Sequence, residues 1–375
     1  MSSQDSAVGD TLGVEEEYAL VDAVTGGLAD APDVAATAAD LVGAAATREI
    51  STSQLEIVTP VCSSLSEVRA ELVRLRSTAV AAAEAHGCRV LAAGTHPFAT
   101  WGEQRMSDDE RYHRLHERWG ILARQQLITG QHVHVGVPAD LVVHVVDRLG
   151  PDLPVLLAMT ASSPFWEGED TGYASYRTQW FSRWPITGTL PVLGDLAAYD
   201  EMVARLVTAG VADDASHLYW DARPSLRWPT VEVRVADTSP LLDDAVLHAA
   251  LVRSLVRVAA RDDRPVPPAH AEVVRVARWR AARDGLSGQL FDTRTASLLP
   301  AHALVRGLLE RVREDLEELG DWDEVAAMVE QLLARGTSAQ RQRRVLERTG
   351  SLRSVVQSLT DEVTGQDLSR GGRSG

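Results

Sequence analysis

An α+β fold, in which short strands and longer helices mix along one chain, is predicted by three features of this sequence. Four short segments alternate apolar side chains with charged or imidazole ones, which is the pattern of strands with one buried face. Longer stretches carry apolar residues at helical spacing, and the last third of the chain is almost entirely of this kind. Gly- and Pro-rich loops separate the elements, and no fixed-period repeat indicates a solenoid or a propeller.

Helices are expected wherever the apolar periodicity continues for two turns or more. Two of them begin with a serine followed three residues later by a glutamate, the spacing of a capping box: Ser64 with Glu67, and Ser107 with Glu110. The expected helical ranges are 33–45, 65–86, 108–127, 139–149, 197–209, 241–261, 269–283 and much of 301–360.

The chain has 375 residues, 45% of them hydrophobic, which is enough for a large core. Its two ends, residues 1–10 and 365–375, are polar and aperiodic, so we expect them to be mobile and residues 11–364 to form a single domain. The start lacks the features of a signal peptide, and no apolar run approaches a membrane-spanning length. We therefore expect a cytoplasmic protein.

The balance of charge and cysteine excludes several classes of protein. A net charge of -16 repels nucleic acid and anionic membranes on average, so neither is an expected partner, although a local basic cleft could bind ATP. Cys62 and Cys88 stand outside any CxxC spacing, so we expect two buried thiols rather than a disulfide framework or a thiolate zinc site.

Lysine is absent from the sequence, and all 37 basic residues are arginine. This excludes a P-loop lysine, a Schiff-base lysine and a lysine nucleophile. Any phosphate chemistry must therefore depend on metal ions and on guanidinium groups, whose planar fork suits phosphate and carboxylate.

Carboxylates lie on the first two predicted strands, residues 14–18 and 55–58. Glu15 and Glu17 are two residues apart and share one face of the first strand, where their like charges repel unless a cation lies between them. The alternative is a solvated acidic edge strand. Glu56 is enclosed by apolar neighbours in the second strand, and it too requires a partner.

Imidazole groups lie on the third predicted strand, residues 132–135. His132, His134 and Gly136 share a face, and the glycine lets a ligand approach closely. Buried histidines are often structural, but two of them at this spacing favour a ligand role, and His132 is the preferred candidate.

The fourth predicted strand, residues 231–235, has a valine stripe on one face, with Glu232 and Arg234 on the other. A cross-strand salt bridge is the alternative to a shared site. Several glutamates with one or two histidines and no thiolate suit Mg²⁺ or Mn²⁺ better than zinc, and the number of carboxylates indicates more than one ion.

Together these residues resemble the YbdK-type carboxylate-amine ligases of the bacterial glutamate-cysteine ligase superfamily. The resemblance covers roughly residues 11 to 345, and the order of its blocks over this length is more specific than any one of them. Gln131 departs from it, because the family commonly has an apolar residue there. The matching blocks are 13–22, 56–61, 94–99, 130–138, 162–168, 171–177, 220–224 and 230–237.

The resemblance implies a glutamine synthetase-like fold, in which a curved, mainly antiparallel sheet forms a cup for ATP and metal and is backed by helices. It also implies that Arg234 faces the transferring phosphate and acts in catalysis together with Glu232. Arg177 is the candidate for gripping the substrate carboxylate, with Arg223 second, and His134 is expected to contact substrate. The implied metal ligands are Glu15, Glu17, Glu56, His132 and Glu232.

The expected activity is the ATP-dependent joining of a carboxylate to an amine through an acyl phosphate, with Mg²⁺ or Mn²⁺. Glutamate and cysteine, giving γ-glutamylcysteine, are the expected small-molecule substrates, and another carboxylate or another amine remains open, as does a homo-oligomer. Three alternatives use the same residues: a metal-dependent hydrolase without ATP, a non-catalytic nucleotide- or metal-binding module, and a phosphotransferase without an amine acceptor.

Overall fold

The computed structural model of the protein describes residues 8–266 and 271–370. Of the ends that were expected to be mobile, residues 1–7 and 371–375 lie outside this part of the chain, whereas residues 8–10 are described and residues 365–370 belong to a helix. The first described residues are held in place, because the carbonyls of Val8 and Gly9 accept hydrogen bonds from Arg257 and Arg253.

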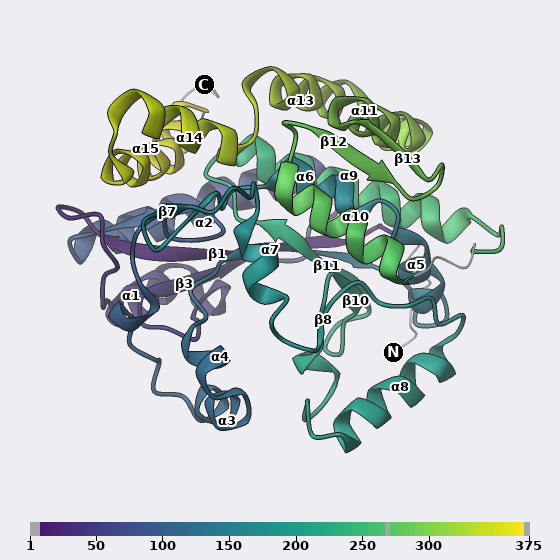
Figure 1. The fold of residues 1–375 in the computed structure, drawn as a ribbon, viewed down its shortest axis with the longest axis horizontal. Helices are drawn as coiled ribbons and strands as arrows, with labels where there is room; N and C mark the ends of the chain where they lie inside the picture. Colours follow the sequence, from purple (N-terminus) through teal and green to yellow (C-terminus); the bar gives the residue numbers. More distant parts are fainter. Residues whose placement is uncertain (1–7, 267–270, 371–375) are drawn as a thin grey trace.

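A seven-stranded antiparallel sheet forms the centre of the molecule, with the order β10-β11-β5-β1-β3-β2 and with β4 paired to β1 (Figure 1). The four strands predicted from the alternating segments are all in it, as β1, β3, β5 and β11. The predicted α+β class and mainly antiparallel sheet are thus confirmed. The seven strands are β1 (Leu12–Asp22), β2 (Ala46–Arg48), β3 (Gln54–Val58), β4 (Cys88–Leu91), β5 (Gly130–Gly136), β10 (Ala222–Pro224) and β11 (Thr230–Asp237).

Three small strand pairs accompany the main sheet. Two are antiparallel hairpins and one, β8 with β9, is parallel. They are β6 (Phe165–Trp166) with β7 (Glu169–Asp170), β8 (Thr187–Gly188) with β9 (Tyr219–Trp220), and β12 (Gln289–Asp292) with β13 (Ser297–Pro300).

The helices cover one side of the sheet more fully than the other. In Figure 1, α2, α6 and α9 lie above the sheet with α10, α11 and α13, whereas α3, α4 and α8 project below it. The α-helices are α1 (Asp33–Val42), α2 (Leu65–Ala85), α3 (Glu110–Trp119), α4 (Ile121–Arg124), α5 (Val142–Leu149), α6 (Leu153–Thr160), α7 (Tyr176–Phe181), α8 (Leu196–Thr208), α9 (Leu242–Arg261), α10 (Ala271–Asp284), α11 (Ala301–Arg311), α12 (Arg313–Leu319), α13 (Trp322–Arg335), α14 (Ser338–Thr349) and α15 (Leu352–Arg370).

Two expectations about helices are wrong in detail. The single helix expected over residues 108–127 is two helices, because Gly120 adopts a left-handed φ of 56° between α3 and α4. Ser107 is not at the N-cap position of α3, which begins at Glu110, and its hydroxyl donates to the Glu49 carbonyl. Ser64 does cap α2 by accepting from the Glu67 N–H, but the Glu67 carboxylate turns to Ser63.

The apolar core lies between the sheet and the helices above it. Valines of β5 and β11 pack with α5, α6 and α9, as the predicted stripes required. On the same side, Gln131 is buried and links β5 to α9, donating to the Ala245 carbonyl and lying 2.9 Å from the His248 ring nitrogen. A polar residue is tolerated at this position because both ends of its amide are satisfied.

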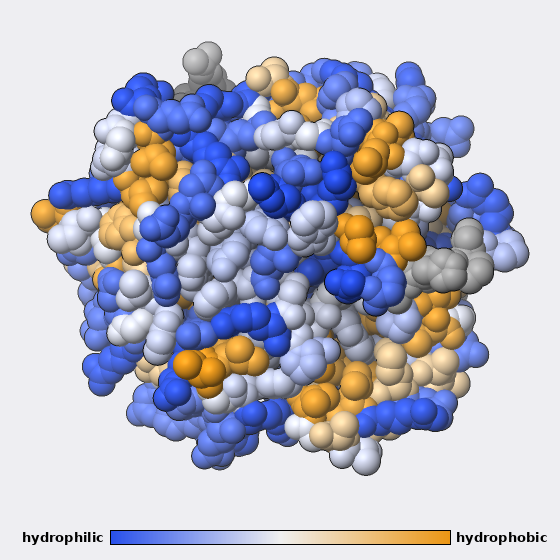
Figure 2. All heavy atoms as spheres, in the orientation of Figure 1, coloured by the Kyte–Doolittle hydropathy of each residue, from blue (hydrophilic) through white to orange (hydrophobic). Residues whose placement is uncertain are grey.

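The surface in Figure 2 is largely hydrophilic, with apolar side chains in small separate groups. Within residues 8–266 and 271–370, no helix combines the length and the apolar character needed to cross a membrane. Both cysteines are buried and unpaired, as expected.

Candidate active site

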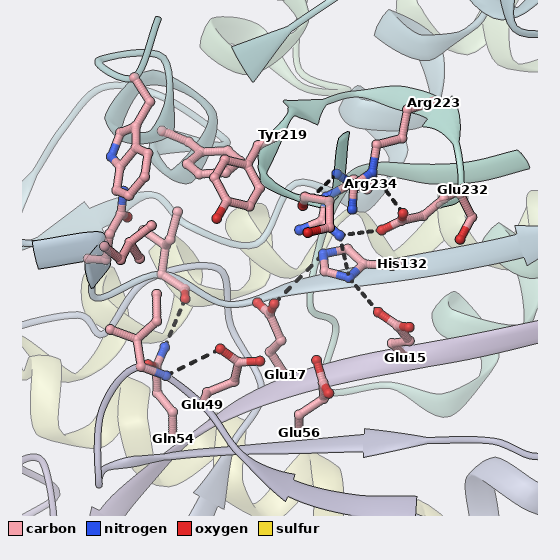
Figure 3. A pocket seen from close by; sticks show the side chains of 18 of the residues that line it. Glu15, Glu17, Glu49, Gln54, Glu56, His132, Tyr219, Arg223, Glu232 and Arg234 are labelled. Atoms are coloured by element: carbon pink, nitrogen blue, oxygen red, sulfur yellow. Dashed lines mark hydrogen bonds and ion pairs between the residues drawn. The ribbon is translucent and has the colours of Figure 1, made fainter. Parts of the chain in front are cut away.

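A cavity of about 240 Å³ opens on the face of the sheet turned away from α2. Figure 3 shows carboxylates from the β1 and β3 side pointing toward His132, while Glu232, Arg234 and Arg223 enter from β11 and β10. Every residue proposed from the sequence for metal, phosphate or substrate lines this cavity: Glu15, Glu17, Glu56, His132, His134, Arg177, Arg223, Glu232 and Arg234.

Strand register brings these side chains together. Glu15 lies directly opposite His132 on β5, and Glu232 lies directly opposite His134. On the other edge of β1, Glu17 lies opposite Glu56 of β3. Residues paired in this way have neighbouring side chains on one face, so the alternation read from the sequence places them in one site.

The first acidic group consists of Glu15, His132 and Glu232, which offer ligand atoms that all lie within 4.8 Å of one another. His132 Nδ1 lies 3.0 Å from Glu15 Oε2. His134 joins the group at its edge, with Nε2 3.2 Å from Glu15 Oε1 and Nδ1 3.0 Å from the Thr230 hydroxyl.

Two arginines neutralise this first group. Arg234 donates to Glu232 Oε1 and lies 3.3 Å from His132 Nδ1, while Arg223 Nε donates to Glu232 Oε2 at 2.8 Å. Burial alone would raise the pKa of Glu232, but the charges of Arg234 and Arg223 lower it. Burial would likewise raise the pKa of Glu15, which His132 and His134 hold well below its usual range.

Arg234 reaches the site through an irregularity in β11. The pairing with β5 shifts between Val233 and Ala236, so that two residues of β11 stand opposite one of β5. The Arg234 N–H turns to the Asp221 carbonyl of the neighbouring segment. Such a bulge re-aims a side chain, here toward His132.

The second acidic group consists of Glu17, Glu49 and Glu56, whose ligand oxygens also lie within 4.8 Å of one another. The Gly130 N–H donates to Glu17, and the Thr47 hydroxyl donates to Glu56. Burial raises the pKa of Glu56 well above its usual range, and the nearby charge of Glu49 raises it further.

Both acidic groups fit divalent cations of the hard, oxygen-preferring type. The second group contributes carboxylates alone, and the first adds an imidazole, a ligand set that matches Mg²⁺ or Mn²⁺. Among the described residues, the buried Nε2 atom of His132 has no hydrogen-bond partner, and burial together with Arg234 lowers the pKa of His132. A neutral imidazole nitrogen without a hydrogen-bond partner is available to bind a metal ion.

The other cationic side chains differ in how they are used. Arg177 is buried beside the site, and the three hydrogen bonds of Arg223 Nη1 go to the carbonyls of Ala215, Ser216 and Leu218. Since its Nε is bonded to Glu232, the Arg223 guanidinium is occupied mainly by the protein itself.

Sequence reasoning missed Glu49 and the apolar wall of the cavity. Glu49 follows β2 and is returned to the site by the β2–β3 pairing, in which Thr47 lies opposite Glu56. A glutamate seven residues before Glu56, within one strand–loop–strand segment, was the available signal. The wall consists of Ile50, Tyr112, Leu115, Ile128, Phe181, Trp184, Tyr219, Leu226 and Trp228.

Comparison with known sequences gives a consistent match. The model of "Glutamate-cysteine ligase family 2" matches residues 11–358. A protein of Salinispora tropica named "Putative glutamate--cysteine ligase 2" is 45% identical over 362 residues, covering 94% of this chain and 95% of the relative. A Frankia alni protein named "Putative glutamate--cysteine ligase 2-2" is 42% identical over 373 residues, covering 94% and 97%.

Comparison with solved structures shows the same fold at low identity. The glutamate–cysteine ligase of Francisella tularensis, solved in complex with AMP, has a TM-score of 0.71 and 15% identity, covering 97% of this chain and 90% of that one. The bifunctional glutathione synthetase of Pasteurella multocida has a TM-score of 0.74 and 16% identity, covering 96% and 53%. The expected glutamine synthetase-like fold is confirmed, and the chain belongs to glutamate-cysteine ligase family 2, a family of carboxylate–amine ligases.

Proposed function

We propose that this protein is an ATP-dependent ligase that joins the γ-carboxyl group of glutamate to the amino group of cysteine, giving γ-glutamylcysteine. The observation that carries the proposal is the pair of acidic groups on one sheet face, with Arg234 beside the first of them. The family names its substrates, and the AMP in the Francisella relative supports a nucleotide site in this fold.

Divalent cations would be held by Glu15, His132 and Glu232 in one group and by Glu17, Glu49 and Glu56 in the other. When bound, such ions neutralise the negative charge of phosphate groups. Glu49 is added here to the ligands proposed from the sequence, because its carboxylate completes the second group.

The chain's own cations hold the reacting groups. Arg234 faces the phosphoryl group in transfer and stabilises the charge that develops on its oxygens, as arginines do at other phosphoryl-transfer sites. Arg177 grips the substrate carboxylate. Arg223 is better suited to orienting Glu232 than to a second grip, because its donors already face the protein.

The reaction needs no covalent protein intermediate. An oxygen of the substrate carboxylate attacks the γ-phosphorus of ATP, the bond to the β,γ-bridging oxygen breaks, and ADP leaves an acyl phosphate. The amine nitrogen then attacks the acyl carbon, the C–O bond to phosphate breaks, and the nitrogen loses a proton as the amide forms. Positioning and electrostatics supply the acceleration.

The deciding assay follows ADP and amide together in purified protein supplied with Mg²⁺, ATP and glutamate, with and without cysteine. Coupled formation of both products, lost on addition of EDTA, is the expected result. If ADP forms without amide, with cysteine and with a panel of other amines, the proposed amine acceptor is wrong and a phosphotransferase is favoured. An absence of nucleotide turnover with any carboxylate would contradict the ligase and favour the hydrolase or the binding module.

A further inference from the structure

Asp237, the last residue of β11, is a carboxylate with no exposure to solvent. Its Oδ2 accepts from the Ser162 N–H at 2.8 Å and from the Ser163 hydroxyl at 2.7 Å, and its Oδ1 accepts from the Ser175 hydroxyl at 2.9 Å. Nothing in the proposed chemistry uses this carboxylate. A buried charge with three directed donors requires an explanation, because burial is costly unless the charge has a partner.

The two serines that Asp237 holds fix the helix that carries Arg177. Ser175 is the N-cap of α7 and accepts from the Thr178 N–H, so Asp237 binds the residue at which the helix begins. Ser163 accepts the Arg177 backbone N–H at 3.0 Å while its own hydroxyl donates to Asp237. Asp237 thus reaches Arg177 through one hydrogen-bonded residue, Ser163, and holds the start of the same helix through a second, Ser175.

Two glycines leave room for this arrangement. A Cβ atom on Gly130 would lie 2.2 Å from Arg177 Nη2, and a Cβ atom on Gly94 would lie 2.6 Å from Asp237 Cγ. A side chain at Gly130 would force the Arg177 guanidinium to move, and one at Gly94 would force the Asp237 carboxylate to move. Both groups are therefore enclosed by backbone, which limits the positions they can adopt.

Most hydrogen-bond donors of the Arg177 guanidinium have no acceptor among the described residues. Within the described residues it donates one hydrogen bond, from Nη2 to the Arg234 carbonyl at 3.4 Å, and its buried Nε has no partner. Asp237 Oδ1 lies 3.9 Å from Nη1, near enough to attract the charge but too far to accept a hydrogen bond. The guanidinium lines the cavity, and of its five N–H donors only one, on Nη2, is hydrogen-bonded among the described residues.

We propose that Asp237 is a positioning residue, which with Ser163 and Ser175 fixes Arg177 so that its free donors meet the carboxylate of the substrate. The inference rests on the proposed role of Arg177 in the ligase. Asp237 supplies the compensating charge without occupying the fork of the guanidinium, which stays available for bidentate binding.

The first test is the crystal structure of Asp237→Asn, which needs no activity. We expect the Arg177 guanidinium to leave its place beside Gly130, because an amide has only one acceptor oxygen and cannot accept both from the Ser162–Ser163 pair and from Ser175, and because the charge is removed. Asp315→Asn is the matched control, since Asp315 is an equally buried carboxylate paired with Arg257 far from the cavity. An unmoved Arg177 in Asp237→Asn would overturn the proposal.

The second test measures glutamate binding by calorimetry in the presence of Mg²⁺ and a non-hydrolysable ATP analogue. Asp237→Asn is expected to raise the Kd of glutamate by about tenfold or more, leaving that of the nucleotide unchanged, while Asp315→Asn changes neither. In an Arg177→Met background Asp237→Asn should have no further effect, because its influence passes through Arg177. An equal loss in both backgrounds would overturn the positioning role.

Ser163→Ala keeps the inference testable if Asp237→Asn does not fold. It removes one link and should raise the Kd of glutamate in the same direction by a smaller factor; no change would count against the proposal. Failure of the proposed function would look different. If the wild-type protein binds glutamate but forms no amide, the proposed ligase activity is contradicted. If Arg177→Met leaves glutamate binding unchanged, the proposed binding of the substrate carboxylate by Arg177 is contradicted.

Discussion

Neighbouring glutamates of this site are driven toward opposite protonation states. Arg234 and Arg223 lower the pKa of Glu232, whereas burial and the charge of Glu49 raise that of Glu56. The first acidic group is therefore compensated by the protein's own arginines, and the second is left with excess negative charge. Either protonation of Glu56 or a cation bound from solution relieves that repulsion.

Arg234→Gln tests the residue closest to the proposed phosphoryl transfer. We expect kcat to fall by about a thousandfold, the order found for arginines that stabilise such transition states, while the KM of the carboxylate changes little. Steady-state ADP release is the measurement, with Arg205→Gln on the exposed face of α8 as the control. A kcat within the range of the control would remove Arg234 from the mechanism.

Glu15→Gln and Glu232→Gln test the first acidic group. Each replacement keeps the shape of the side chain but removes a negative ligand, so the far-ultraviolet circular dichroism should be unchanged while metal-dependent turnover is lost. The exposed Glu201→Gln serves as control. Unchanged rates in both variants would contradict the assignment of the metal group.

At the scale of single residues, alternation along the strands was enough to predict seven cavity side chains, because each strand has one face that must be apolar. Arg177 and Arg223 came from the family resemblance instead. Glu49 could not be found this way, since it lies in the loop after β2 and reaches the site only through tertiary pairing. Asp237 was hidden for a different reason: its partners come from segments some 60 to 75 residues distant in the chain.

At the scale of elements, one face of β1 lines the cavity and the other face carries a buried ion pair. Glu15 and Glu17 face the cavity, while Glu16 between them is fully buried and receives two hydrogen bonds from Arg76 of α2. Arg76 also donates to the carbonyls of Ser239 and Pro240, just after β11. One buried ion pair thus joins the strand that carries the first carboxylates to the end of the strand that carries Glu232 and Arg234.

Arg76→Met should therefore destabilise the fold by about 3–5 kcal/mol, because it leaves the Glu16 charge buried and unpaired. Urea denaturation followed by circular dichroism gives the free energy of unfolding. The double variant Glu16→Leu/Arg76→Met should recover most of the loss, since it removes both buried charges. If the double variant were as unstable as the single one, lost packing rather than an unpaired charge would be the cause.

Helices and strands were predicted where the spacing of apolar residues determines them. Their interruptions were missed where the local backbone or contacts distant in sequence determine them. The last third of the chain is largely helical as expected, since apolar spacing continues through α10 to α15, with the β12–β13 hairpin as an interruption. Apolar spacing also continued across Gly120, but it carries no information about the φ of a single glycine. The bulge in β11 is equally invisible to alternation, although it directs Arg234 to His132.

At the scale of the whole molecule, the strand order could not be derived from the pattern of faces. Alternation shows that β1, β3, β5 and β11 each have an apolar side, but not that β1 lies between β3 and β5. That order depends on contacts between segments more than 100 residues apart, such as Glu15 with His132. The family resemblance supplied the mainly antiparallel character of the sheet, but not the order of its strands.

Distant segments are also joined through His96, which ties the turn after β1 to the loop after β4. Its Nε2 lies 2.9 Å from the Gly26 carbonyl, and its Nδ1 accepts the N–H groups of Phe98 and Ala99. Nδ1 can accept these bonds only in the neutral ring. Burial lowers the pKa of His96 to about 4, against about 6.5 for a solvated histidine.

The consequence is a pH dependence of folding in a defined window. Between pH 6.5 and 4 the unfolded chain binds a proton at His96 that the folded protein does not, so the free energy of unfolding falls as pH falls, by about 3 kcal/mol in all. Urea denaturation of wild type and His96→Asn from pH 7.5 to 4 measures this, with the exposed His302→Asn as control. The wild type should lose this much more stability than His96→Asn across the window, and equal losses would mean that His96 is protonated in the fold.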